Sequence, residues 1–264
     1  MRTVLLAAAL FMLSSADVSA APLDEAISGN HRSAENRSRD AYRHPAETLE
    51  FFGFRPDMTV VELWPGGGWY TEILAPALRD NGELVLAVFG EAEPDSYRTR
   101  SHRAFVEKIE SEPEIFGKAT LVNFWPPENA SLGQPASADL VVTFRNVHSM
   151  FRRDQFEAFL AAAYAVLKPG GTLGVVQHRA EPGSDPEDAK RSGYLPEQWV
   201  IDQASAAGFE LSARSEINAN PRDTRDHPDG VWSLPPGYGS GDKDREKFAA
   251  IGESDRMTLR FSKP

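Results

Sequence analysis

Two histidines, two arginines and an asparagine follow apolar runs in the middle of this 264-residue sequence. Arg145, Asn146 and His148 come after ADLVVTF, and His178 and Arg179 come after TLGVVQ. An imidazole titrates near neutral pH and can take a proton from a reacting hydroxyl group. An arginine can hold a carboxylate through two hydrogen bonds. These residue types predict a site that binds a small polar molecule and moves a proton.

Structural alternatives exist for the same residues. Arg145 could instead form an ion pair with Glu62 or Asp139 that braces a loop. A lone histidine is more often hydrogen-bonded to backbone than catalytic. Both interpretations stay open for each residue at the level of the sequence.

A metal site is the weakest of the alternatives. His44 and His227 could join His148 and His178 as ligands, because imidazole binds several transition metals. No two of these four histidines are spaced as ligands on one helix or strand. We therefore expect no metal.

A glycine-rich segment, MTVVELWPGGGWYTEILA at residues 58–75, separates a strand pattern from a helix pattern. Thr59 to Leu63 is apolar and β-branched, which is typical of a buried parallel strand. Pro65 to Gly68 end that strand, and apolar residues at helical spacing follow Trp69. A strand, glycine turn and helix expose backbone N–H groups to a ligand. We expect a small molecule to bind over residues 62–70.

Strand and helix patterns alternate along the rest of the chain. Strands are predicted at 83–88, 118–123, 138–144, 172–177, 209–217 and 257–261, and helices at 45–52, 95–110, 154–167 and 196–207. The alternation predicts one α/β domain over residues 21–264, with a doubly wound, seven-stranded, mostly parallel sheet and an antiparallel last strand. Residues 21–40 are polar, without an apolar face, and predict a poorly ordered arm.

The glycine-rich segment resembles the first nucleotide-binding loop of class I S-adenosylmethionine-dependent methyltransferases, whose pattern is acid-x-Gly-x-Gly-x-Gly. Here Glu62 is the acid and Trp64 stands in place of the first glycine. The second strand ends at Phe89, where these enzymes usually carry an acid that binds the ribose. Residues 139–147 and 166–173 are similar to the fourth-to-fifth-strand region of small-molecule methyltransferases, including those that methylate quinone precursors.

The chain more closely resembles a family of exported, predicted methyltransferases without a known substrate. The shared segments are residues 62–70, 143–148, 178–180, 223–228 and 254–258. The resemblance implies the methyltransferase fold and methyl transfer from S-adenosylmethionine to a small nucleophile. It implies cofactor contacts from Glu62, Trp64, Gly66, Gly67, Gly68, Tyr70 and Phe89, with Arg145, Asn146, His148 and His178 around the reacting atoms.

A long segment rich in proline and glycine, at about residues 219–255, connects the last two predicted strands. Such connections are often lids over a site, although a solvated loop is the default for a charged run. We expect Arg179, Arg225, His227 and Trp232 to face substrate or form the lid, and Arg145, Asn146, His148, His178, Arg179 and His227 to converge on one cavity. Trp64, Trp69 and Tyr70 could stack on an aromatic ligand or pack under the loop.

Residues 1–20 have the pattern of a secretory signal peptide: Arg2, an apolar run from Val4 to Leu13, and the cleavage motif Val18-Ser19-Ala20. We expect export to the periplasm, with no later membrane segment. The chain has no cysteine, which excludes disulfides and thiolate metal sites. Its net charge of −11 argues against a nucleic-acid partner and leaves a small molecule as the expected ligand. Oligomeric state is not predicted.

Because S-adenosylmethionine is made in the cytoplasm, export favours a second hypothesis. The chain could be an exported small-molecule-binding protein that keeps the methyltransferase fold without using the cofactor. Trp64 and Phe89, which depart from the usual methyltransferase pattern, also favour this second hypothesis.

Overall fold

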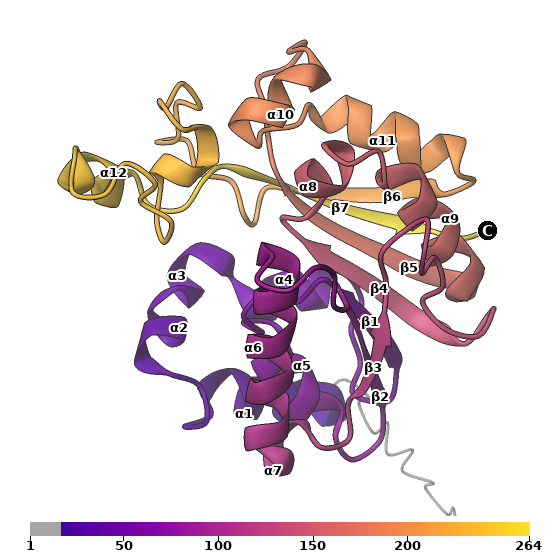
Figure 1. Cartoon of the computed structure of the whole chain (residues 1–264). Helices are drawn as coiled ribbons and strands as arrows, with labels where there is room; N and C mark the ends of the chain where they lie inside the picture. The colour runs from indigo at the N-terminus through magenta and orange to yellow at the C-terminus, as the bar shows by residue number, and fades with distance from the viewer. Residues whose placement is uncertain (1–16) are drawn as a thin grey trace, which may run out of the picture.

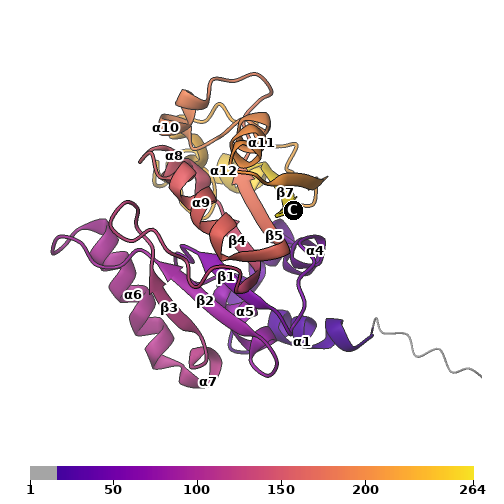
Figure 2. The ribbon, with the colours of Figure 1, turned by 90° about the vertical axis from the view of Figure 1, so that its right-hand side faces the viewer.

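The computed structural model describes residues 17–264, so most of the predicted signal peptide lies outside the described residues. Seven strands form one sheet with the order β3-β2-β1-β4-β5-β7-β6. They are β1 (Thr59–Leu63), β2 (Glu83–Val88), β3 (Thr120–Asn123), β4 (Ala138–Phe144), β5 (Leu167–His178), β6 (Glu210–Ser215) and β7 (Arg256–Ser262). Only β7 runs antiparallel to its neighbours, β5 and β6. Figure 2 shows β3, β2 and β1 side by side at the opposite edge of the sheet. The predicted fold class is confirmed.

Helices cover both faces of this sheet (Figure 1). They are α1 (Asp17–Ser28), α2 (Ala34–Ser38), α3 (Asp40–Arg43), α4 (Pro45–Phe51), α5 (Thr71–Leu78), α6 (Tyr97–Ser111), α7 (Pro113–Phe116), α8 (Val147–Phe151), α9 (Phe156–Val166), α10 (Ala189–Ser192), α11 (Glu197–Ala206) and α12 (Arg245–Ile251). The structure also has two short 3₁₀ helices, η1 (Pro186–Asp188) and η2 (Gly230–Ser233).

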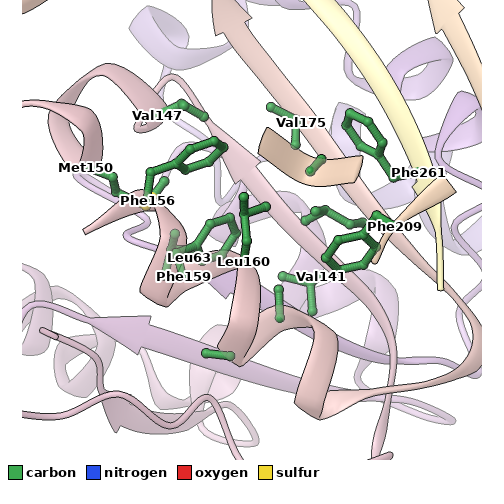
Figure 3. Close-up of a cluster of buried hydrophobic side chains, with 14 of the residues drawn as sticks. Leu63, Val141, Val147, Met150, Phe156, Phe159, Leu160, Val175, Phe209 and Phe261 are labelled. Atoms are coloured by element: carbon green, nitrogen blue, oxygen red, sulfur yellow. The ribbon is translucent and has the colours of Figure 1, made fainter. Parts of the chain in front are cut away.

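The core on one face packs α8, α9 and α11 against the sheet (Figure 3). Phe156, Phe159 and Leu160 recur at helical spacing along α9, and all three are buried. They lie over Val141 and Val175 of the central strands. Each such side chain stabilises the fold by roughly 1.5–3 kcal/mol relative to exposure, which fixes the strands that carry the site.

On the other face, α1, α4, α5, α6 and α7 form a second core. The ring of Phe52, which caps α4, lies so close to β5 that a Cβ at Gly174 would come within 2.7 Å of it. A glycine at this strand position therefore allows α4 to sit directly on the sheet. The Phe52 ring also lies 6.4 Å from the ring of Phe144, the last residue of β4.

Residues 21–40 are ordered, and the prediction of a poorly ordered arm is wrong. Arg32 is only 1% exposed and donates two hydrogen bonds to the Asp40 carboxylate at 2.8 and 2.7 Å. The Trp69 indole N–H donates to the Asn36 carbonyl at 2.9 Å, and Leu23 is buried in the second core. Partners distant in sequence satisfy the polar groups that made this segment look solvated.

Strand β5 starts at Leu167, five positions before the predicted strand at 172–177. The Pro-Gly-Gly segment lies in a register irregularity against β4, between the pairs Ala138–Leu167 and Leu140–Thr172. The Pro-Gly-Gly segment therefore forms a bulge within β5 and does not end the strand. The segment between β6 and β7 contains η2 and α12, and α12 lies away from the sheet (Figure 1).

Candidate functional site

A cavity of about 910 Å³ lies over the carboxyl ends of β1 to β5. Loops after each of these strands line it, together with α2, α3 and residues 231–237 of the connection between β6 and β7. Its lining includes nine predicted site residues: Trp64, Gly66, Gly67, Phe89, Arg145, Asn146, His148, His178 and Trp232. Six others do not line it: Glu62, Gly68, Tyr70, Arg179, Arg225 and His227.

The loop after β1 presents open backbone to this cavity. Gly66 has a φ of +62°, and a Cβ built at Gly66 or Gly67 would meet nothing within 4 Å. Gly67 has ordinary backbone angles, so no contact within the described chain requires glycine there. Gly68 differs, because its φ is +80° and a Cβ would lie 3.1 Å from Phe105. Gly68 therefore shapes the turn rather than contacting a ligand.

Glu62 lies buried beneath the loop instead of facing a cofactor. Its carboxylate accepts a hydrogen bond of 2.7 Å from the Thr71 hydroxyl at the start of α5. Burial raises the pKa of Glu62 to about 7, against smaller opposing effects of Thr71 and Lys108. Glu62 thus joins strand to helix and does not line the cavity, and its predicted contact with the cofactor stays a prediction.

Three aromatic side chains from consecutive strand ends form one wall of the cavity. The Trp64 indole N–H donates to the Phe124 carbonyl at 3.0 Å, and its ring lies 5.0 Å from Phe89 and 5.6 Å from Trp125. The Arg98 guanidinium stacks over Trp125 at 4.2 Å. Trp125 was not predicted, although a tryptophan directly after a strand is a usable signal.

Tyr70 packs under the loop, as the structural alternative proposed. Its ring stacks on Phe144 with the centroids 3.5 Å apart, and its hydroxyl donates to the Arg43 carbonyl at 3.3 Å. Trp69 lines the cavity, and the guanidinium groups of Arg32 and Arg43 lie 4.9 and 4.6 Å from its ring. The tryptophan thereby fixes two arginines of the N-terminal helices in place.

Asn146 connects the end of β4 with the glycine loop. Its side-chain amide donates to the carbonyls of Leu63 and Trp64 at 3.0 and 3.1 Å. Arg145 before it adopts a left-handed φ of +63°, with its backbone N–H bonded to the Val176 carbonyl at 2.7 Å. Both residues line the cavity, since they directly follow the carboxyl end of β4.

Both cavity histidines are neutral at neutral pH. His178 Nδ1 lies 2.5 Å from the Ser254 hydroxyl, and His148 Nδ1 lies 3.4 Å from the Gln177 amide oxygen. Burial lowers the pKa of His148 to about 4 and the pKa of His178 well below its usual value. A neutral imidazole is the form that can accept a proton. The two ring centroids are 5.3 Å apart.

A buried carboxylate that the sequence analysis missed lies at the arginine side of the cavity. Glu253 is 3% exposed and pairs with Arg39 at 2.8 Å, Arg43 and Arg256 at 3.1 Å each, and Arg145 at 3.6 Å. Burial acts to raise the pKa of Glu253, but the surrounding arginines outweigh it and lower the pKa to about 2. Arg145 therefore pairs with neither Glu62 nor Asp139. Only the motif starting at Ser254 hinted at this position.

Arg179 and Arg225 form a closed ion network away from the cavity. Arg179 bonds Asp255 at 2.9 Å and Glu216 at 2.7 Å, and Arg225 bonds Asp255 at 2.7 Å and the side chain of Glu181. Neither residue lines the cavity, so the predicted convergence of Arg179 on it is wrong. The predicted substrate or lid role of both stays a prediction, and nearby carboxylates engage both guanidinium groups. They brace the entry into β7.

His227 also lies outside the cavity, and its predicted convergence with the strand-end residues is wrong. Its Nε2 lies 2.8 Å from the Asp223 carboxylate, which also accepts a bond from the Tyr194 hydroxyl. The ring packs against Phe248 of α12 with the centroids 5.6 Å apart. The connection nevertheless reaches the cavity through Trp232, whose ring lies 5.7 Å from His148.

Residues 17–264 contain neither a candidate metal cluster nor a candidate membrane-spanning helix. No three histidine, aspartate or glutamate side chains there are grouped closely enough to hold a metal ion. None of the helices in that range is long and apolar enough to cross a membrane.

The fold matches that of known methyltransferases. No family model and no curated protein sequence matches the chain. A SAM-dependent methyltransferase from Aquifex aeolicus matches 86% of this chain and 93% of its own, with 15% identity and a TM-score of 0.57. A putative sarcosine dimethylglycine methyltransferase from Galdieria sulphuraria covers 88% of each chain, with 14% identity and a TM-score of 0.57.

A third similar structure is named for a different reaction. The [4+2]-cyclase SpnF matches 90% of this chain and 85% of its own, with 17% identity and a TM-score of 0.57. The chain therefore has the fold of the class I S-adenosylmethionine-dependent methyltransferases. At such identities the likeness concerns the fold, and the reaction must be argued from the site.

Proposed function

We propose that this protein is an S-adenosylmethionine-dependent methyltransferase that acts on a small molecule. The observation that carries the proposal is the open backbone at Gly66 and Gly67, which lines a large cavity at the carboxyl ends of parallel strands. Ligands of doubly wound sheets bind at this place. The left-handed φ of Gly66 by itself favours glycine, whereas the fold does not need glycine at Gly67, and a ligand that approaches the backbone closely would explain that residue.

The residues around the cavity fit this cofactor. The backbone at Gly66 and Gly67 would contact its methionine part, and the wall of Trp64, Phe89 and Trp125 offers aromatic faces for adenine. Glu93 lines the cavity after β2 and supplies a carboxylate for the ribose hydroxyls, which β2 itself lacks. When bound, S-adenosylmethionine supplies a methyl group on a positively charged sulfur.

The remaining lining residues orient the acceptor and take its proton. In the tautomer that donates from Nδ1 to Ser254, His178 keeps Nε2 unprotonated, so this nitrogen can accept a hydrogen bond or a proton from a ligand in the cavity. Asn146 fixes the glycine loop relative to β4, where the reacting groups would meet. Most of the rate would come from this alignment of nucleophile and methyl group.

An exported binding protein on the same fold is the second candidate. It is favoured by Trp64, whose buried indole occupies part of the space at the strand ends where the related loops carry glycine. Export itself stays a prediction from the sequence. Binding of S-adenosylmethionine or S-adenosylhomocysteine separates the two candidates, since only the methyltransferase requires it.

Gly67→Ala tests the proposed function. Nothing lies within 4 Å of the new Cβ, so the free energy of unfolding should change by no more than about 1 kcal/mol. Calorimetric affinity for S-adenosylhomocysteine should fall roughly tenfold or more, because the methyl group blocks the backbone contacts of the ligand. Gly183→Ala, at an open position outside the cavity, is the control for binding: its φ of +82° makes the alanine cost some stability, but the variant should bind normally. Absence of binding by the wild type would refute the proposal.

A further inference from the structure

The cavity carries a surplus of positive charge on its lining. Five arginines line it, Arg39, Arg43, Arg98, Arg145 and Arg153, against two glutamates, Glu93 and Glu128. Arg39, Arg43 and Arg145 gather with Arg256 around one buried carboxylate, Glu253. Four guanidinium groups thus share a single negative partner, which leaves three positive charges without a carboxylate in that cluster.

Arg43 is the sharpest sign of a missing partner. Its side chain is 1% exposed, and only Nε reaches Glu253, at 3.1 Å. Nη1 and Nη2 are buried and have no hydrogen-bond partner among residues 17–264. Buried charged donors left unbonded are costly, and the fold holds this group rigidly through the Trp69 ring at 4.6 Å. A bidentate anion would satisfy both nitrogens.

Arg145 supports the same conclusion from the other side of the cluster. Its only ion pair among the described residues is the 3.6 Å contact with Glu253, which is longer than a hydrogen bond. Its left-handed backbone is held in place by the bond from its N–H to Val176. Strained conformations of this kind gather at binding sites. Arg43 and Arg145 also repel each other, and an anion between them would remove that repulsion.

We propose that the methyl acceptor carries an anionic group, a carboxylate or a phosphate ester, which Arg43 and Arg145 hold in the cavity. That the bound anion is a methyl acceptor rests on the proposed function, whereas the existence of an anion site does not. His178 and Trp232 line the same cavity, so the rest of such an acid would lie between a neutral base and an aromatic surface. The proposal assigns the N-terminal helices, through Arg39 and Arg43, to substrate recognition.

The carboxylate of the cofactor itself is the competing occupant, and the test is designed around it. Malonate and inorganic phosphate are titrated separately by calorimetry at constant ionic strength, both into the protein without ligand and into the protein saturated with S-adenosylhomocysteine. We expect at least one of them to bind saturably. Arg145→Gln should weaken this binding roughly tenfold or more. Arg222→Gln removes an exposed charge outside the cavity and should leave binding unchanged.

The outcomes separate this proposal from the proposed function. Competition between the anions and S-adenosylhomocysteine would assign the arginines to the cofactor and overturn the acceptor class. No anion binding by wild type, or equal binding by Arg145→Gln, would overturn the anion site. Anion binding with no binding of S-adenosylhomocysteine would refute the methyltransferase while keeping the anion site. Tighter binding of malonate would indicate that the acceptor carries a carboxylate, and tighter binding of phosphate would indicate a phosphate ester.

Discussion

Glu62 and Glu253, two buried glutamates near the cavity, have pKa values shifted in opposite directions. Glu62, beneath the glycine loop, has one hydroxyl as its polar side-chain partner, and its pKa rises to about 7. Glu253, at the arginine cluster, is equally buried, yet its pKa falls to about 2 because four arginines surround it. Burial alone does not decide the charge of a carboxyl group, and the partners do.

The difference extends to what each end of the cavity can bind. The loop end combines open backbone and aromatic rings, which suit an uncharged or cationic ligand part. The arginine end keeps an excess of donors and suits an anion. Arg179 and Arg225 around Asp255 differ from Arg43 in this respect. Their Nη atoms have carboxylate partners, whereas Arg43 reaches a carboxylate only through Nε, and its Nη1 and Nη2 have no partner among residues 17–264. The first cluster braces the fold, and the second can also recognise a ligand.

Glu253→Gln should give the largest effect. Removing the carboxylate leaves Arg43 and Arg256 buried without a counter-charge, which typically costs about 3–5 kcal/mol. The free energy of unfolding in urea measures the loss. Glu216→Gln, whose ion pair with Arg179 is exposed, is the matched control and should cost no more than about 1 kcal/mol. Equal losses in the two variants would show that the buried cluster contributes no more than a surface pair.

Glu62 should make the protein less stable as pH rises from about 4.5 to about 7. In this range the folded protein keeps the Glu62 proton that the unfolded chain has already released, so the contribution of Glu62 to stability falls with increasing pH. The lowered pKa values of His148 and His178 act in the opposite direction in both proteins, so the effect of Glu62 is read from the difference between them. The total change is roughly 3 kcal/mol, and Glu62→Gln should abolish it. Urea unfolding of both proteins across this range measures the difference. Parallel pH profiles would refute the raised pKa.

The effect of Glu253 falls in a different window of pH. Its lowered pKa contributes stability above the ordinary glutamate value, and this contribution is lost as pH falls toward about 2. The two carboxylates can therefore be distinguished in one set of titrations, since Glu62 acts above pH 4.5 and Glu253 below it.

Arg145→Gln should have the smallest effect on stability. It loses one 3.6 Å ion pair and relieves repulsion from neighbouring arginines, so the free energy of unfolding should change by no more than about 1 kcal/mol. Thermal or urea unfolding measures this without ligand. A loss as large as that of Glu253→Gln would make Arg145 a structural member of the cluster and remove the contrast between folding and binding.

The sequence alone determined the order and type of the main elements. Strand runs such as ADLVVTF and the amphipathic pattern of α9 depend on neighbours along the chain, so their periodicity is visible without tertiary structure. Rules of parallel sheets then placed Arg145, Asn146, His148 and His178 at one edge, where the structure brings them into one cavity. The hydrogen bond between Glu62 and Thr71 also joins residues that are close in the sequence, only nine positions apart.

Only the tertiary structure decided which charged residues are free and which are paired. Glu253 meets Arg43 across 210 positions of sequence, and Asn36 meets Trp69 from a segment that looks solvated by composition. His227 and Arg179 look as reactive in the sequence as His178, but Asp223 and Asp255 engage them. Ionic and hydrogen-bonding side chains show no periodicity, because their energy depends on the geometry of a few distant partners. The anion-binding end of the cavity is therefore a property of the folded chain.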